Sequence, residues 1–341
     1  MARLKVFVVD QLATGEAPAR RPSRSLRRQG DMLLQALLAD LGALPDVDPV
    51  AAPSLDAMPG RDAGTAAIAD VAGTDGAGSL SGMPGAQADG AVWPLACESE
   101  GALERLSRAI LRGRRILLGS APGAIEVAAS KLRLARVLAE GGVAAVATYS
   151  PHGALPQDGG PWVVKPDDGA GCLDTRLFSD RAAALAWIRA SATDGHALQS
   201  YVLQPFLAGK LGSLSLLCCD GAARVLACNQ ERVAMRDNRF HYLGSIVNGL
   251  ADDDGALARL ARQVAAAMPS LWGYVGVDFV LTAQGAVVLD VNPRLTAAYV
   301  GLHASTGCNP AGQVLELLRG PVQMEAPAGM RRAVSVDVGA P

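Results

Sequence analysis

Two carboxylates, an amide and a guanidinium stand close together near the C-terminal end of this sequence. Asp278 lies in the apolar run YVGVDFVL, and Asp290 closes the run GAVVLDVN just before Asn292 and Arg294. The turn between the runs predicts a hairpin, which would bring the two carboxylates and the amide to one end of a sheet. Such oxygen ligands suit Mg²⁺, which takes few protein ligands. A strand followed by an ordinary turn is the alternative, because Asp, Asn and Pro are common at strand ends.

A second group of residues could bind phosphate. Lys165 ends the run PWVVK, and the glycine-rich segment DDGAGC follows at residues 167–172. A lysine in this position needs an anion if it is buried, and small residues let backbone N–H groups approach phosphate oxygens. Lys131, on a predicted helix at 123–141, could supply a second cation. Surface lysines beside a flexible loop are the alternative interpretation.

The elements that would position these residues follow a mixed α/β pattern. Apolar runs predict strands at 4–9, 114–119, 161–166, 201–206, 213–219, 223–235, 274–281 and 285–292. Helical spacing of apolar residues predicts helices at 24–41, 99–113, 123–141, 180–191 and 255–268. Residues 43–92 are rich in Ala, Gly, Asp and Pro, and we expect irregular chain there that interrupts the first domain.

Composition excludes several classes of partner. The 341 residues are 50% hydrophobic and carry a formal net charge of −2, without a long basic run that would bind nucleic acid. No apolar stretch approaches the roughly 18 residues that a membrane span requires. Six cysteines without a C-x-x-C pair do not form a disulfide framework in a chain of this length. We therefore expect a cytoplasmic protein with small-molecule partners, no nucleic acid and no membrane.

The order of these features resembles a known superfamily. A helix lysine, a strand lysine, a glycine loop, the strand end LQPF and the pattern D-x₁₁-D-x-N-P-R together resemble the ATP-grasp carboxylate–amine ligases, over about residues 119–318. The resemblance implies two α+β subdomains, at 119–200 and 201–320, that clasp ATP. It also implies a small N-terminal α/β domain at 1–118 and a C-terminal tail at 321–341. The implied activity is ATP- and Mg²⁺-dependent amide formation through an acyl phosphate, with release of ADP and phosphate.

The resemblance assigns a role to each matching residue. Lys131 and Lys165 correspond to lysines that contact the nucleotide phosphates, and Arg294 to the arginine that steadies the acyl phosphate, so that Lys165 and Arg294 are the predicted catalytic residues. Asp278, Asp290 and Asn292 correspond to the magnesium ligands. The glycine loop and the segment whose backbone reads the adenine complete the predicted ATP-binding set: Asp168, Gly169, Ala170, Gly171, Cys172, Gln204, Pro205, Phe206 and Leu207.

Three positions need separate comment. Asp290 stands where many members have Glu, so the shorter side chain must bring the metal closer to the strand. Gln204 also stands where many have Glu, which removes a charge expected near the ribose. Acyl-phosphate chemistry needs no side-chain nucleophile, so we expect Cys172 to be a small packed residue of the loop.

Four segments resemble a narrower group, the tyramine–glutamate ligases of methanofuran-type cofactor biosynthesis, whose bacterial relatives serve methylofuran. They are SLRRQGDMLLQALLADL, KPDDGAGC, HYLGSIVNG and NPRLTAAYVGL. This resemblance implies the γ-carboxylate of glutamate as the activated acid, and tyramine or tyrosine as the amine. The predicted substrate-binding residues are Tyr242, Asn248, Arg294, Thr296 and Tyr299, and the basic segment 20–28 is the predicted partner of the glutamate α-carboxylate.

Alternatives stay open at this point. The acid could be another amino acid or a peptide-like acid, or the chain could bind a nucleotide without catalysis. Retention of Lys165, both carboxylates and Arg294 argues against loss of catalysis, because a binding module has no need for a transfer arginine. The sequence leaves open the number of magnesium ions and of glutamates added, and whether the protein forms a homo-oligomer.

Overall fold

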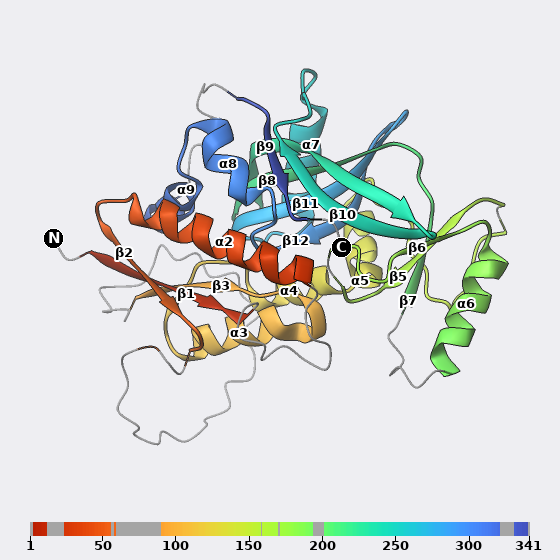
Figure 1. Cartoon of the computed structure of the whole chain (residues 1–341), viewed down its shortest axis with the longest axis horizontal. Coiled ribbons are helices and arrows are strands. Elements are labelled where there is room, and N and C mark those ends of the chain that lie inside the picture. The colour runs from red at the N-terminus through yellow and green to blue at the C-terminus, as the bar shows by residue number, and fades with distance from the viewer. Residues whose placement is uncertain are drawn as a thin grey trace.

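Two β-sheets of different character organise the chain (Figure 1). The computed structural model describes residues 3–11, 24–55, 58, 90–157, 159–169, 171–193, 201–320 and 331–339. The first sheet is parallel, in the order β2-β1-β3-β4. Its strands are β1 (Leu4–Asp10), β2 (Val47–Ala52), β3 (Ala91–Leu95) and β4 (Ile116–Leu117).

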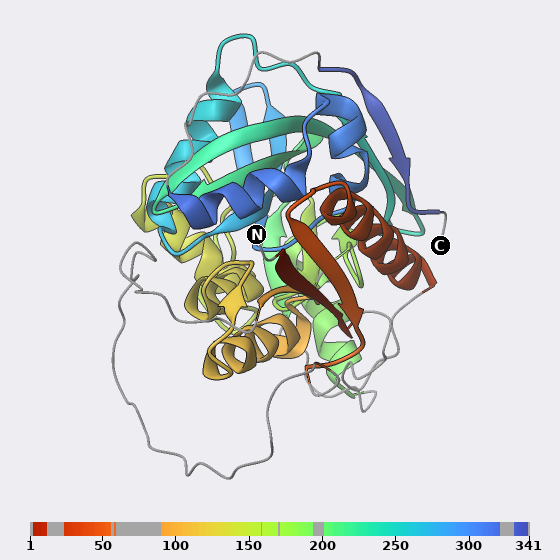
Figure 2. The ribbon, with the colours of Figure 1, turned by 90° about the vertical axis from the view of Figure 1, so that its left-hand side faces the viewer.

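The first sheet is buried on both faces, which explains why β1 is a continuous apolar run rather than an alternating one. Val6 and Val8 pack toward helix α2 (Arg24–Gly42), whereas Phe7 and Val9 pack toward helix α3 (Ala102–Arg112). Figure 2 shows these two helices on opposite sides of the sheet. A short 3₁₀ helix, η2 (Ser99–Gly101), leads into α3.

The expectation of irregular chain at 43–92 is wrong at both ends of that range. Residues 47–52 form β2, and β3 begins at residue 91. β2 contains Asp48 and Pro49, which are rare inside sheets, and it lies at the sheet edge, where proline is tolerated. Its pairing with the buried β1 compensates for a weak local preference. Residues 59–89 lie outside the described part of the chain.

The second sheet is antiparallel, with nine described strands in the order β12-β11-β8-β9-β10-β6-β5-β7 and β13 beside β10. The strands are β5 (Trp162–Pro166), β6 (Arg176–Phe178), β7 (Tyr201–Pro205), β8 (Lys210–Cys219), β9 (Ala222–Arg236), β10 (Arg239–Val247), β11 (Gly273–Thr282), β12 (Gly285–Asn292) and β13 (Val334–Asp337). The predicted hairpin is present as β11 and β12.

Helices surround this sheet: α6 (Arg181–Thr193), α7 (Ala256–Ala267), α8 (Tyr299–Thr306), α9 (Pro310–Glu316) and the 3₁₀ helix η3 (Leu317–Arg319). The sequence analysis predicted neither β10 nor the helices that follow residue 292. None of the helices within the described residues is long and apolar enough to cross a membrane.

The predicted helix at 123–141 is two helices, α4 (Pro122–Ala129) and α5 (Lys131–Glu140). Ser130 between them is extended, and its hydroxyl accepts a hydrogen bond from the backbone N–H of Arg133, which caps α5. The same hydroxyl donates to Asp167 at 2.7 Å. The break therefore starts α5 at Lys131 and ties this start to the glycine-rich segment.

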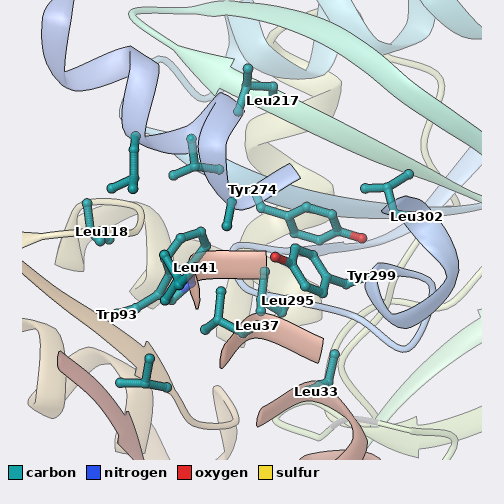
Figure 3. Packing of buried hydrophobic residues seen from close by; sticks show 14 of the residues in the cluster. Leu33, Leu37, Leu41, Trp93, Leu118, Leu217, Tyr274, Leu295, Tyr299 and Leu302 are labelled. Atoms are coloured by element: carbon teal, nitrogen blue, oxygen red, sulfur yellow. The ribbon is translucent and has the colours of Figure 1, made fainter. Parts of the chain in front are cut away.

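A hydrophobic core joins the N-terminal unit to the second sheet (Figure 3). Leu33, Leu37 and Leu41 on α2 pack toward the rings of Tyr274 and Tyr299. The two rings meet edge to face, with centroids 5.5 Å apart. This packing holds α2 beside the C-terminal helices and beside the end of the β11–β12 hairpin. The domain boundaries given by the sequence remain predictions.

Candidate active site

A cavity of about 350 Å³ opens where the glycine loop, the ends of β5 and β7 and the β11–β12 hairpin meet. Predicted site residues from widely separated segments line it: Lys131, Lys165, Gly169, Gly171, Cys172, Gln204, Pro205, Phe206, Leu207, Tyr242, Asp278, Asp290, Asn292, Arg294 and Thr296. The fold thus brings the predicted cations and the predicted acids into one cavity.

The two hairpin aspartates lie directly opposite each other across β11 and β12. A register shift follows Asp278, so the ladder is irregular at the acidic pair. The Asn292 amide donates to Asp278 Oδ2 at 3.0 Å. Lys131 Nζ is 3.5 Å from Asp290 Oδ2, so one carboxylate of the pair has a cationic neighbour and the other has an amide.

The charges in this cavity are strongly perturbed. Burial, reinforced by the nearby Glu231 and Asp290 carboxylates, raises the pKa of Asp278 to about 7. Burial also lowers the pKa of Lys165 to about 8, although Asp290 opposes this shift. A cation beside Asp278 would favour its carboxylate form, and an anion beside Lys165 would favour its ammonium form. A site that binds a metal ion and a phosphate together would supply both.

The chemistry of the donors fits Mg²⁺. Two carboxylates and an amide oxygen are hard ligands, and magnesium completes its shell with phosphate and water. Within the described ranges, no three His, Cys, Asp or Glu side chains group into a metal centre of their own. A magnesium ion here would therefore be held by Asp278, Asp290 and Asn292 together with oxygens of the nucleotide.

Lys131 binds the glycine loop as well as Asp290. Its buried ammonium donates to the carbonyl oxygens of Asp167 at 3.2 Å and of Gly169 at 2.9 Å. The Asp168 carboxylate does not line the cavity; it accepts from the backbone N–H of Glu100 at 2.5 Å. The loop is thus attached both to α5 and to the N-terminal unit. Ala170, predicted to bind ATP, lies outside the described residues.

Arg294 is fixed by a residue that the sequence analysis missed. Its Nε lies 2.7 Å from Glu98 Oε2, and both side chains are largely buried. Burial disfavours the charged guanidinium, but the Glu98 carboxylate, together with Cys97 and Asp278, outweighs burial and raises the pKa of Arg294. Glu98 stands in CESEG, between β3 and α3, with no sequence signal linking it to Arg294. The packing of the N-terminal unit alone brings the pair together.

The segment predicted to read the adenine lies along one wall of the cavity. The Gln204 side chain is buried and donates to the Thr148 hydroxyl at 2.9 Å, so it has a partner within the protein.

Cys172 also lines the cavity, and burial raises the pKa of its thiol to about 11. This thiol stays protonated near neutral pH, which argues against a nucleophilic role.

The structure places two of the predicted substrate-binding residues outside the cavity. Tyr299 is buried in the core, where its hydroxyl donates to Asp40 at 2.9 Å. The Asn248 amide donates to Ser305 at 2.8 Å, and its oxygen accepts from the backbone N–H of Cys228. A separate cavity of about 430 Å³ lies beside Asn248. A substrate contact is therefore not retained for either residue, because each already has structural partners.

Only part of the basic segment 20–28 lies in the described chain, so its predicted pairing with a substrate carboxylate stays a prediction. Residues 20–23 lie outside the described chain, and Arg27 and Arg28 are exposed rather than cavity-lining. From the same helix, Leu26 and Gln29 line the cavity instead. Among the described arginines of this segment, neither Arg27 nor Arg28 faces the cavity to pair with a substrate carboxylate.

Comparison with known proteins agrees with this geometry. The model of an ATP-grasp domain family matches residues 128–298, half of the chain, and the chain belongs to this family. The match spans both lysines, the glycine loop and the acidic hairpin. The mixed α/β fold is accordingly an ATP-grasp fold, as predicted. No curated protein matches the sequence.

Solved structures share the fold at low sequence identity. A protein from Archaeoglobus fulgidus assigned to the ATP-grasp superfamily has a TM-score of 0.64 at 20% identity, over 98% of this chain and 99% of that one. The L-amino acid ligase from Bacillus licheniformis has a TM-score of 0.59 at 16% identity, over 94% and 75%. The D-alanine–D-alanine ligase from Bacillus anthracis, solved with ATP, has a TM-score of 0.59 at 13% identity, over 93% and 97%. Such identities establish the fold alone.

Proposed function

We propose that this protein is an ADP-forming ligase that joins the γ-carboxylate of L-glutamate to tyramine or tyrosine, with ATP and Mg²⁺, in the biosynthesis of a methanofuran-type cofactor such as methylofuran. The observation that carries the ligase chemistry is the single cavity in which Lys131 and Lys165 face Asp278, Asp290 and Arg294. The choice of acid and amine rests on the resemblance of four sequence segments to tyramine–glutamate ligases.

Binding of the nucleotide would use both sides of the cavity. Lys165 and Lys131 would pair with the phosphates, and Gly169 and Gly171 would let backbone N–H groups approach the phosphate oxygens. Asp278, Asp290 and Asn292 would hold Mg²⁺, which when bound neutralises charge on the phosphate oxygens. Because Lys131 now pairs with a loop carbonyl, nucleotide binding should exchange that contact for a phosphate.

The reaction needs positioning and charge neutralisation rather than a protein nucleophile. A carboxylate oxygen of the acid attacks the γ-phosphorus, the bond from that phosphorus to the bridging oxygen breaks, and ADP leaves. The neutral amine then attacks the acyl carbon, phosphate leaves with the former carboxylate oxygen, and the amine gives up a proton. Arg294, held at the cavity edge by Glu98, would donate hydrogen bonds to the acyl phosphate.

The remaining wall of the cavity fits small organic substrates. Leu26, Val233 and Phe240 give it an apolar side suited to an aromatic amine, and Tyr242 and Thr296 add hydroxyl groups. All six cysteines are free, which fits the reducing cytoplasm that we propose as the location. Another amino acid or a peptide-like acid remains the alternative donor, since the names of two structural neighbours specify ligases of amino acids.

Phosphate release tests this proposal. The protein is incubated with ATP, Mg²⁺, glutamate and a panel of amines that includes tyramine and tyrosine, and products are separated by chromatography. We expect ADP, phosphate and one amide with glutamate and a phenolic amine. Formation of AMP and pyrophosphate would contradict the ligase chemistry, and turnover with a different acid would contradict only the substrate assignment. Tight Mg-ATP binding without turnover by any pair would favour a nucleotide-binding module.

A further inference from the structure

One carboxylate in the cavity has no role in the chemistry described so far. Glu231 lies on β9, where it and Val233 line the cavity. Alternate residues of a strand face opposite ways, so the intervening Arg232 points to the other face. There its guanidinium pairs with Asp337 and the carbonyl oxygen of Val336. Glu231 therefore faces the cavity without its neighbouring arginine.

The two oxygens of Glu231 have different surroundings. Oε1 accepts a hydrogen bond from the Ser213 hydroxyl, and Ser213 itself accepts from the buried Asn229 amide at 3.2 Å. Oε2 is shielded from solvent and accepts no hydrogen bond that the structure shows within its described part. The Tyr242 hydroxyl faces this carboxylate as a hydrogen-bond donor, and it opposes the rise in the pKa of Glu231 that burial causes. Ser213 fixes Oε1, and Oε2 keeps the capacity to accept a hydrogen bond from a ligand.

Among the described residues, three cations line the cavity, and none of them pairs with Glu231. Lys131 pairs with Asp290, Arg294 pairs with Glu98, and the anion that acts most strongly on Lys165 is Asp290. The groups that face Glu231 are the hydroxyls of Ser213 and Tyr242 and the Asp278 carboxylate, which is the cross-strand neighbour of Ser213. Burying an ionised carboxylate beside such groups costs free energy. The Arg232 guanidinium on the other face offsets only part of that cost, because burial still raises the pKa of Glu231. A cationic group on a bound ligand would offset that cost.

We propose that Glu231 is a specificity-determining residue that binds a primary ammonium group of the substrate through Oε2. The inference rests on the proposed function, since a ligase of amino acids and amines handles such groups. Two sources share this chemistry, the α-ammonium of the acid and the ammonium of the acceptor amine. Glu231 lies in the same cavity as the apolar side chains of Val233 and Phe240, a combination that suits an organic ammonium. It belongs to β9, whereas the predicted magnesium ligands belong to β11 and β12.

The test compares wild type with Glu231→Gln, which keeps the shape of the side chain and removes its charge. Glu140→Gln is the matched control, because Glu140 is an exposed residue at the end of α5 and does not line the cavity. Calorimetry with Mg²⁺ and a non-hydrolysable ATP analogue measures binding of two ligand pairs. Glutamate and glutarate differ by the α-ammonium, and tyramine and 4-ethylphenol differ by the acceptor ammonium.

Loss of a hydrogen bond between charged groups should lower the affinity of Glu231→Gln for the ammonium ligand by about tenfold to a hundredfold. The ligand of the same pair that lacks the ammonium should bind equally well to wild type and to Glu231→Gln. The pair in which the ammonium ligand loses affinity identifies whether the acid or the amine supplies the ammonium. The affinity for the ATP analogue, and the Mg²⁺ concentration that it requires, should match those of wild type and of Glu140→Gln.

Three results would overturn the assignment. The ammonium site would be rejected if wild type and Glu231→Gln bind every ligand with the same affinity. The same conclusion would follow if neither protein binds any of these ligands. An altered Mg²⁺ requirement with an unchanged preference for ammonium ligands would make Glu231 a metal ligand instead. A selective loss of ammonium binding in a protein that releases no phosphate would leave this site standing and reject the ligase proposal. Normal ligation by Glu231→Gln with unchanged KM values would reject the ammonium site and leave the ligase proposal standing.

Discussion

The Asp40 cluster and the acidic cavity treat buried carboxylates in opposite ways. Asp40, on α2, accepts from the Tyr299 hydroxyl at 2.9 Å and lies 2.6 Å from His303 Nδ1. Both oxygens of this carboxylate have partners, and they tie α2 to α8. In the cavity, by contrast, Asp278 has an amide partner and a pKa of about 7, and Glu231 has an oxygen without a partner among the described residues.

The difference distinguishes a carboxylate that stabilises the fold from those that we propose bind a ligand. A carboxylate whose hydrogen bonds are all made within the protein stabilises the fold and needs no ligand to satisfy them. A carboxylate crowded by others, with a raised pKa, is stabilised when a cation arrives. The comparison predicts that changes in the Asp40 cluster alter stability, whereas changes in the cavity alter binding and turnover.

The largest expected effect is the loss of turnover in Asp290→Asn. The substitution removes one charge from a magnesium site with few protein ligands, and a misplacement of the reacting phosphate by about 1 Å costs on the order of 10²-fold in rate. We therefore expect kcat to fall by at least about 10²-fold, measured by phosphate release, with an unchanged circular dichroism spectrum. Turnover close to wild type would remove Asp290 from the metal site.

Glu98→Gln should have the next largest effect, because it leaves the Arg294 guanidinium in place without its charged partner. A hydrogen bond between charged groups contributes about 1.5–3 kcal/mol, so we expect kcat to fall by roughly tenfold to a hundredfold. The KM for ATP should change little, since the pair does not touch the lysines. A rise in the KM for ATP with kcat unchanged would contradict a positioning role for Glu98.

Asp40→Asn should change stability and spare catalysis. It weakens the bonds to Tyr299 and His303, and the free energy of unfolding should fall by about 1–3 kcal/mol. Urea unfolding measures the change, and phosphate release at a temperature where the variant is folded measures kcat. A variant with normal stability and impaired ATP turnover would break the distinction between the two regions.

The smallest expected effect is on the pH dependence of Mg-ATP binding. The pKa of Asp278 is raised to about 7, so below that pH the free protein holds a proton that metal binding must displace. Affinity should be highest between about pH 7 and 8, where Asp278 is ionised and Lys165 is still protonated, and it should fall by up to about tenfold per pH unit below pH 7. Calorimetry in buffers of different ionisation enthalpy should detect proton release near pH 7. No proton release there would contradict metal binding by Asp278.

The sequence predicted the hairpin that carries the two aspartates better than it predicted the surrounding structure. Asp278 and Asp290 could be paired in advance, because the apolar runs and the turn between them specify a hairpin. Glu98 could not be paired with Arg294, since 196 residues separate them and only tertiary packing brings them together. Tyr299 was assigned to the substrate from a motif, whereas its position on α8 turns it toward Asp40.

The helix break at Ser130 and the edge strand β2 were missed for local reasons. Apolar spacing continues through residues 123–141, so it predicts one helix. The break depends on the Ser130 hydroxyl and its partners Arg133 and Asp167, which the apolar spacing does not reveal. β2 contains a proline and an aspartate, and its extended form depends on pairing with β1. Glu231 gave no signal either, because its unpartnered oxygen is a property of the folded site.

The most direct test of the ligase chemistry follows one oxygen atom. Glutamate labelled with ¹⁸O in both oxygens of its γ-carboxylate is incubated with ATP, Mg²⁺, a phenolic amine and the protein, and the products are analysed by mass spectrometry. Formation of an acyl phosphate predicts one ¹⁸O in the released inorganic phosphate and one ¹⁸O retained in the amide, with ADP unlabelled. Unlabelled phosphate, or label recovered in AMP, would contradict the account.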